Sequence, residues 1–266
     1  QAEDGIRDLR MSRGLGDVYK RQAQLVVMLV MMVGVFRSKK EENVLKGIRL
    51  FEPFSKEELG NICKIGGPTA IQGMVYCMIS MVLTRMVAAF GAEAIATQRV
   101  GGQIESVSWN TADGFAAALN AFVGQNYGAK KMDRVQKGYR ISFWTVAIWG
   151  ALIMLAFIIF PGPIAGVFFH EEKAMEIAIS YLIIIGFSEA FMCVELMTIG
   201  ALSGLGKTKL CSVISITATS MRIPLAMVLS RTSLGLDGIW WALTLTSVAK
   251  GIIFYLTFRY QMREKC

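Results

Sequence analysis

The sequence predicts an all-α membrane protein, and two observations carry that prediction. Hydrophobic residues make up 54% of the chain and charged residues only 18%, a balance that soluble domains of this length rarely have. The apolar residues also gather in long runs, and residues 141–160 contain no charge at all. A helix of about twenty apolar residues is long enough to cross a bilayer. We therefore expect a bundle of membrane-spanning helices.

The N-terminal quarter divides into three segments. Residues 1–22 are polar, have no apolar stretch of the signal-peptide kind, and resemble a translated sequencing adapter, so we expect a non-native segment. Residues 23–36 are apolar but short, and we expect the end of a truncated transmembrane helix. Residues 37–64 contain seven Lys or Arg residues and predict a cytoplasmic amphipathic loop on the membrane surface. Within that loop, Ser55 followed by Glu58 is typical of a helix start.

Six full transmembrane helices are expected to follow, within 65–260. Their approximate ranges are 65–90, 95–128, 141–160, 175–204, 210–230 and 238–258. Pro161 should stop the third span, and Pro224 should kink the fifth. Small residues recur every fourth position along the second span, at Ala112, Ala116, Asn120, Gly124 and Gly128. Such a stripe lets a neighbouring backbone approach closely, which is how helices associate in lipid.

Charge in the loops predicts the topology. The alternate loops 37–64, 130–140, 205–209 and 259–266 hold 17 Lys and Arg residues, whereas the opposite loops hold 3. By the positive-inside rule, the first set is cytoplasmic. Cys63, the tail 261–266 and Cys266 should then be inside, and His170 outside, in a multi-pass protein of the bacterial inner membrane. The net charge of +8 follows from these loops, and no nucleic-acid-binding motif accompanies it.

Four carboxylates lie well inside the predicted spans, away from their ends: Glu105, Asp113, Glu189 and Glu195. A carboxylate in mid-membrane costs about 2.5–3.5 kcal/mol, so each is a candidate for binding protons, sodium or a cationic substrate. Eight residues separate Glu105 from Asp113, about 80° around a helix, so both can face one polar region. Six separate Glu189 from Glu195, about 120°, so they cannot both face a narrow cleft. Trp109, one turn after Glu105, adds an aromatic face for a cation.

A structural alternative exists for these acids, because cations also fall within or near the spans. Arg222 lies midway along the fifth span and could pair with a buried carboxylate. Arg85 and Lys250 could extend their charges to a membrane surface. The single histidine, His170, fits a surface loop residue, and we predict neither a catalytic residue nor an enzyme.

The chain resembles the C-terminal lobe of the multidrug and toxic compound extrusion (MATE) family over about 40–260. The resemblance rests on short motifs in the family order: 65–68 (Ile-Gly-Gly-Pro), 90–96, 103–106 (Gln-Ile-Glu-Ser), 124–131 (Gly-Gln-Asn-Tyr-Gly-Ala-Lys-Lys) and 202–208. It implies one of two six-helix lobes around a central cavity, in an antiporter that exports organic cations in exchange for sodium or protons. It also implies that an N-terminal lobe, of which 23–36 is the last piece, is missing.

The same resemblance points to further site residues and leaves alternatives open. In the sodium-coupled branch a carboxylate follows the seventh-helix proline by two turns, and that place falls near Tyr76, with Gln72 one turn earlier. The acid of the tenth helix would fall near Met192, between Glu189 and Glu195. The coupling ion, sodium or proton, stays open, and no cofactor is implied. A flippase of lipid-linked precursors, favoured by a more basic cavity, and a membrane-embedded enzyme are the alternative functions.

Overall fold

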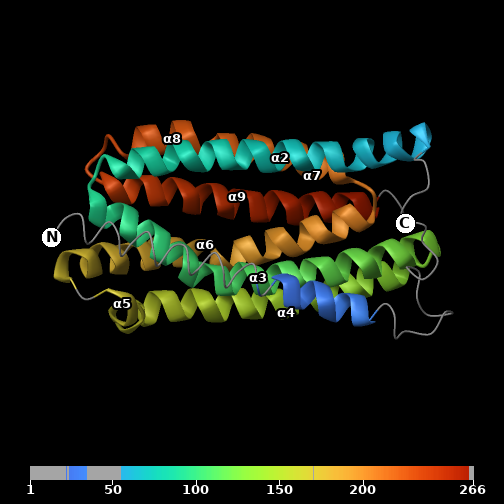
Figure 1. Cartoon of the computed structure of the whole chain (residues 1–266), viewed down its shortest axis with the longest axis horizontal. Coiled ribbons are helices and arrows are strands. Elements are labelled where there is room, and N and C mark those ends of the chain that lie inside the picture. The colour runs from blue at the N-terminus through green and yellow to red at the C-terminus, as the bar shows by residue number, and fades with distance from the viewer. Residues whose placement is uncertain (1–21, 23, 35–54, 170, 264–266) are drawn as a thin grey trace. The chain divides into compact units, whose positions relative to one another are not determined.

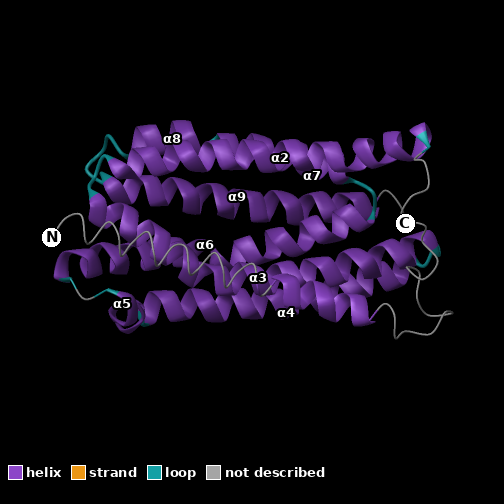
Figure 2. Ribbon diagram, viewed as in Figure 1, coloured by secondary structure: helices purple, strands orange, loops and turns teal. Residues whose placement is uncertain are grey.

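A computed structural model describes residues 22, 24–34 and 55–263, apart from residue 170. The chain divides into two units, Gln1–Lys56 and Glu57–Cys266. In the first, the described part is an apolar helix, Gln24–Gly34, shorter than a membrane span, and residues 1–21 and 35–54 lie outside the description. The second is a bundle of helices (Figure 1), and none of its described residues is in a strand (Figure 2). The all-α prediction is confirmed.

The described helices of the bundle follow the predicted order of spans. They are α2 (Lys56–Ala88), α3 (Ala92–Gly128), α4 (Met132–Ile159), α5 (Pro161–Phe168), α6 (Glu172–Gly204), α7 (Thr208–Ser220), α8 (Arg222–Leu229) and α9 (Leu236–Arg263). Five stretches are long and apolar enough to cross a membrane: Gly66–Ala88 of α2, α4, α6, α7 with α8, and α9. The predicted second span, α3, is the longest of the described helices at 37 residues, but it contains more polar residues and is less apolar than these five.

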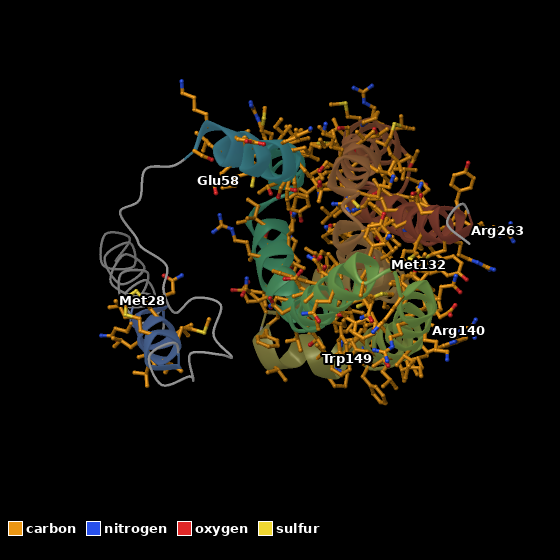
Figure 3. The ribbon with its side chains drawn as sticks, turned by 90° about the vertical axis from the view of Figure 1, so that its right-hand side faces the viewer. Met28, Glu58, Met132, Arg140, Trp149 and Arg263 are labelled. Carbon is orange, nitrogen blue, oxygen red and sulfur yellow. The ribbon has the colours of Figure 1, made fainter. Side chains whose placement is uncertain are left out.

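Several helices extend beyond the apolar runs that predicted them. The helix α2 begins at Lys56, directly after Ser55, so the end of the predicted 37–64 loop is helical. Similarly, α4 begins at Met132 (Figure 3) and includes most of the basic segment 130–140, which was expected to be a loop. At the other end of the chain, α9 continues to Arg263, past the predicted boundary at 260. Hydropathy marks where a helix is apolar, whereas backbone hydrogen bonding continues through charged turns outside the hydrocarbon.

Two prolines act as the sequence predicts. The helix α4 ends at Ile159, and Pro161 then occupies the first turn of α5, where its missing N–H costs no helical hydrogen bond. Pro224 lies just after the break between α7 and α8 at Met221. A proline removes the hydrogen bond to the carbonyl four residues earlier, here that of Ser220, which explains the interruption of this span.

The centre of the bundle is α6, which packs against α3, α4 and α9. Its contact with α3 brings backbone against backbone: a Cβ added at Gly200 would lie 2.3 Å from the Ala116 carbonyl oxygen, and one at Gly204 would lie 2.6 Å from that of Asn120. The small-residue stripe therefore forms the predicted close contact, and it does so with α6.

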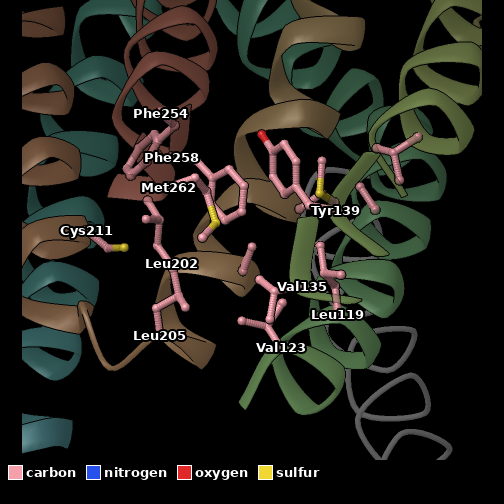
Figure 4. Close-up of a cluster of buried hydrophobic side chains, with 14 of the residues drawn as sticks. Leu119, Val123, Val135, Tyr139, Leu202, Leu205, Cys211, Phe254, Phe258 and Met262 are labelled. Atoms are coloured by element: carbon pink, nitrogen blue, oxygen red, sulfur yellow. The ribbon is translucent and has the colours of Figure 1, made fainter. Parts of the chain in front are cut away.

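Side chains complete the packing in three apolar clusters. The largest joins α3, α4, α6 and α9 (Figure 4), and in it Tyr139 stacks on Phe258 with ring centroids 3.7 Å apart. Another joins α2 to α8 and α9 through Ile79, Leu83 and Val87. All three of these residues lie in the second half of α2, and the described side chains before Ile79 are exposed or half-buried. The part of α2 before Ile79 therefore packs loosely, and space remains between the middle of α2 and the other helices.

Candidate functional site

A cavity of about 480 Å³ occupies that space, with walls from α2, α3, α6, α7, α8 and α9. A neighbouring cavity of about 330 Å³ continues it towards Tyr181 on α6. The two share a set of lining residues: Tyr76, Glu105, Trp109, Met192, Thr219, Arg222 and Ser247. We refer to the two together as the central cavity.

Five of the seven predicted site residues line this cavity. Gln72 and Tyr76 lie one turn apart on α2, and Glu105 and Trp109 lie one turn apart on α3. Glu195 joins them from α6. The one-turn spacing thus identifies one face of α2 and one face of α3, and both faces line the central cavity although they are far apart in sequence.

The other two predicted residues lie elsewhere. Asp113 is exposed and lines neither part of the central cavity, so the structure does not bring it together with Glu105 there. Eight residues rise about 12 Å along a helix in addition to the 80° turn, and the adjoining Ala112 is the residue that packs inward. Glu189 is fully buried and also lines neither part, while Glu195 does. The two glutamates therefore point to different surroundings, in keeping with the 120° between them.

Glu195 forms a buried ion pair. Its Oε1 accepts a hydrogen bond from Lys250 Nζ on α9 at 2.7 Å, and the two side chains are only 6% and 8% exposed. Lys250 thus pairs inside the bundle and does not extend to a membrane surface, as it could have done close to an interface. Lys250 lies twelve residues into the predicted span 238–258, about 18 Å along the helix, so burial was indicated by its depth. Its partner Glu195 is 55 residues away in the sequence, so local sequence patterns do not indicate the pairing.

Arg222 is held by hydroxyl groups. Its Nε donates to Thr246 Oγ1 at 3.1 Å, and its Nη2 donates to Ser247 Oγ at 2.9 Å. No carboxylate among the described residues lies within 4.0 Å of its guanidinium, so the expected direct pairing with a membrane acid is not found. Because Arg222 lines both parts of the central cavity, its charge faces that space.

Glu105 belongs to a small network with Tyr181, which also lines the central cavity, and with Glu189, which does not. Tyr181 Oη donates a hydrogen bond to Glu105 Oε1. Gly101, one turn before Glu105, makes this contact feasible, because a Cβ there would lie 2.2 Å from the Tyr181 ring. Within the described part of the chain, neither carboxyl oxygen of Glu189 has a hydrogen-bond partner. The nearby Ser108 instead shares a hydrogen bond with Cys193 Sγ at 3.3 Å.

The central cavity therefore combines three kinds of chemistry. The Lys250–Glu195 pair neutralises itself, while Glu105 and Arg222 offer opposite charges to the space between the helices. Trp109 and Tyr76 are 42% and 54% exposed and add aromatic surface suited to apolar groups and cations. Among the residues that the structure describes, no three His, Cys, Asp or Glu side chains gather as a metal site. The arrangement is suited to non-covalent binding of an amphipathic molecule.

Comparison with known proteins agrees with this architecture. A probable multidrug resistance protein NorM from Thermotoga maritima is 28% identical over 211 residues, which cover 76% of this chain and 45% of the relative. A crystal structure of MATE in the straight conformation matches with a TM-score of 0.80 at 19% identity, covering 93% of this chain and 56% of the solved one. A Pyrococcus furiosus transporter of the MOP superfamily, described as having a binding pocket of reverse polarity, matches with a TM-score of 0.79 at 20% identity, covering 92% and 56%.

The chain thus spans about half the length of these relatives. The family model MatE matches residues 68–228, more than half of the chain and most of its bundle. The predicted resemblance is confirmed, and the expectation of a transporter instead of an enzyme agrees with it. The chain belongs to the MatE family of membrane transporters.

Proposed function

We propose that this chain is one lobe of a multidrug efflux antiporter, which exports organic cations across the bacterial inner membrane. The observation that carries the proposal is the central cavity, where Glu105, Trp109 and Tyr76 face a common space inside an apolar bundle. The name of the Thermotoga maritima relative, a probable multidrug resistance protein, supports drugs as the cargo. A second lobe would close the open side of the cavity.

In this proposal Glu105 attracts the positive end of the substrate. The residue is half-buried, so a charge–charge attraction there is screened less than at a surface. Trp109 and Tyr76 cover the apolar part of the substrate and contribute cation–π attraction. Arg222 and Glu105 line the same cavity, so a bound organic cation would compete with Arg222 for the negative charge of Glu105.

Glu189 is our candidate for the proton that drives exchange. Its side chain is fully buried, and neither carboxyl oxygen has a hydrogen-bond partner among the described residues. An unpaired buried charge costs several kcal/mol, and binding a proton would remove that cost. Glu105 lies close enough to repel a second negative charge at Glu189. Tyr181, which lines the central cavity and donates a hydrogen bond to Glu105, would connect the cavity to this buried acid. Sodium at the same acids is the alternative coupling ion.

The test is cation transport by the complete protein that contains this chain, reconstituted in liposomes with an imposed pH or sodium gradient. Ethidium serves as the probe. We expect Glu105→Gln to fold in normal yield and to lose ethidium efflux, and Glu189→Gln to lose only the proton-driven part. Glu93→Gln is the matched control, because Glu93 is also on α3 but pairs with Lys173 at the surface.

Normal ethidium efflux by Glu105→Gln would contradict the proposed cation site. An anionic lipid-linked precursor is the alternative cargo, because the guanidinium of Arg222 faces the cavity without a carboxylate within 4.0 Å among the described residues. That alternative would be favoured if Arg222→Gln lost precursor transport while ethidium efflux stayed normal in both Arg222→Gln and Glu105→Gln. The name of the Thermotoga maritima relative, a probable multidrug resistance protein, favours a drug over a lipid precursor as the cargo. We expect residues 23–266 expressed alone to confer no drug resistance.

A further inference from the structure

A second hollow lies outside the central cavity, where α4 begins and α9 ends. Its volume is about 410 Å³, and it shares no lining residue with the central cavity. Three arginines line it, Arg140 from α4 and Arg259 and Arg263 from α9. None of the described residues that line it is an Asp or Glu. The described lining of the hollow therefore carries positive charge and no carboxylate.

The base of this hollow is aromatic and firmly packed. Tyr139 stacks on Phe258 and hydrogen-bonds Thr198 at 3.0 Å, so this part of α4 is fixed to α6 and α9. The Arg259 guanidinium lies 6.0 Å from the centre of the Tyr255 ring. Figure 3 shows Arg140 and Arg263 on the same side of the bundle. An anion in the hollow would thus meet guanidinium groups from both helices.

An apolar pocket of about 260 Å³ adjoins the arginine hollow and shares Phe143 and Tyr255 with it. Its other described lining residues are apolar and come from α4, α6 and α9: Ala147, Ala190, Phe191, Val194, Gly251 and Ile252. Ala147 lies one turn beyond Phe143, and Gly251 lies one turn before Tyr255, so the pocket leads away from the helix ends. It runs in the direction of the membrane interior.

We propose that the two hollows together bind one anionic phospholipid. Arg140, Arg259 and Arg263 hold its phosphate, and one acyl chain passes Phe143 and Tyr255 into the apolar pocket. Guanidinium groups suit phosphate because they donate paired hydrogen bonds, and basic hollows between spanning helices suit acidic headgroups. A soluble phosphate would use the arginines but would leave the apolar pocket empty.

The membrane context supports a lipid in this place. Next to the hollow, α4 exposes Ile141, Trp144 and Ile148, and α9 exposes Leu256, as expected for faces that meet hydrocarbon. Trp144 lines the hollow itself, and tryptophan is enriched where helices cross the membrane–water interface. A bound lipid would join α4 to α9, which otherwise contact each other mainly through side chains such as Tyr139 and Phe258.

The test measures lipid binding to the purified full chain in a neutral detergent by native mass spectrometry. The probes are dioleoyl phosphatidylglycerol, dioleoyl phosphatidylcholine and inorganic phosphate. We expect phosphatidylglycerol to bind at least tenfold more tightly than phosphatidylcholine, and equimolar phosphate not to displace it. Replacing Arg140, Arg259 and Arg263 together by Gln should weaken phosphatidylglycerol binding about tenfold or more.

The matched control replaces Lys131, Arg134 and Lys137 by Gln, which removes the same charge from the same end of α4 but outside the hollow. It should bind phosphatidylglycerol as the parent does. Equal losses in the two triple variants, equal affinity for both lipids, or displacement by phosphate would overturn the proposal. Ala147→Phe, which keeps every charge and fills the apolar pocket, should also weaken binding. If it leaves the affinity unchanged, the acyl-chain site is refuted.

Discussion

The buried ion pair between Lys250 and Glu195 offers the sharpest test of the bundle's energetics. The change is Lys250→Met, which removes the ammonium and keeps a side chain of similar length. Glu195 then loses the partner of its Oε1, and its Oε2 already has no hydrogen bond within the described part of the chain. A negative charge without a partner would be left at a side chain that is only 6% exposed.

Breaking a buried pair from one side costs about 3–5 kcal/mol, because the remaining charge is desolvated without compensation. Because both side chains of the pair are buried, solvent screening does not reduce this cost appreciably. For a domain of this size, 1 kcal/mol corresponds to about 2–4 °C, so the melting temperature should fall by about 6–20 °C. Removing both charges, in Lys250→Met with Glu195→Gln, should restore most of the loss, since replacing a whole buried pair is often close to neutral.

The assay is thermal unfolding of the purified protein in detergent, followed by circular dichroism for the parent, both single variants and the double variant. Lys173→Gln is the control, because Lys173 and Glu93 form an exposed pair at 3.8 Å whose loss should cost at most about 1 kcal/mol. A double variant as unstable as the sum of the singles would refute the ion-pair argument. A Lys250→Met protein as stable as the parent would do so too.

Two further predictions follow from the helix contacts and the topology. Gly200→Val should abolish folded yield, because its Cβ would overlap the Ala116 carbonyl oxygen, whereas Gly114→Ala on α3, with nothing within 4 Å, should fold normally; fluorescence-detected size exclusion measures both, and equal yields would refute the close contact. In intact cells an impermeant thiol reagent should label a cysteine introduced at position 170 but not Cys63, which is exposed but expected to be cytoplasmic; the reverse pattern would invert the topology.

Much of the fold follows from local signals. Apolar runs locate the spans, Pro161 and Pro224 interrupt helices where a missing N–H requires it, and the small-residue stripe on α3 marks a close helix contact. The helix ends were less predictable. Charged turns such as 132–140 continue a helix beyond the hydrocarbon, and hydropathy has no information about them. The stripe also did not identify α6 as the partner, since spacing describes one helix and not its neighbour.

The sequence predicted which helix faces carry the candidate site, but it did not predict which side chains of different helices contact each other. Turn spacing placed Glu105 with Trp109 and Gln72 with Tyr76, and it separated Glu189 from Glu195. It said nothing of partners that come from another helix. Lys250 meets Glu195, and Tyr181 meets Glu105, only because α6 packs between α3 and α9. Both facts depend on the order of helices in the bundle, which a single sequence does not state.

The two sides of the central cavity differ in how firmly the fold holds them. Glu105 lies on α3, whose backbone meets α6 at Gly200 and Gly204, and Tyr181 fits against Gly101 on the same helix. The acidic side is therefore fixed by contacts that leave no room for even a methyl group. Gln72 and Tyr76 lie on the part of α2 before Ile79, where the described side chains are exposed or half-buried. Substitutions in the α3–α6 contact should therefore disturb the acids, while substitutions on α2 should alter substrate contacts with little loss of stability.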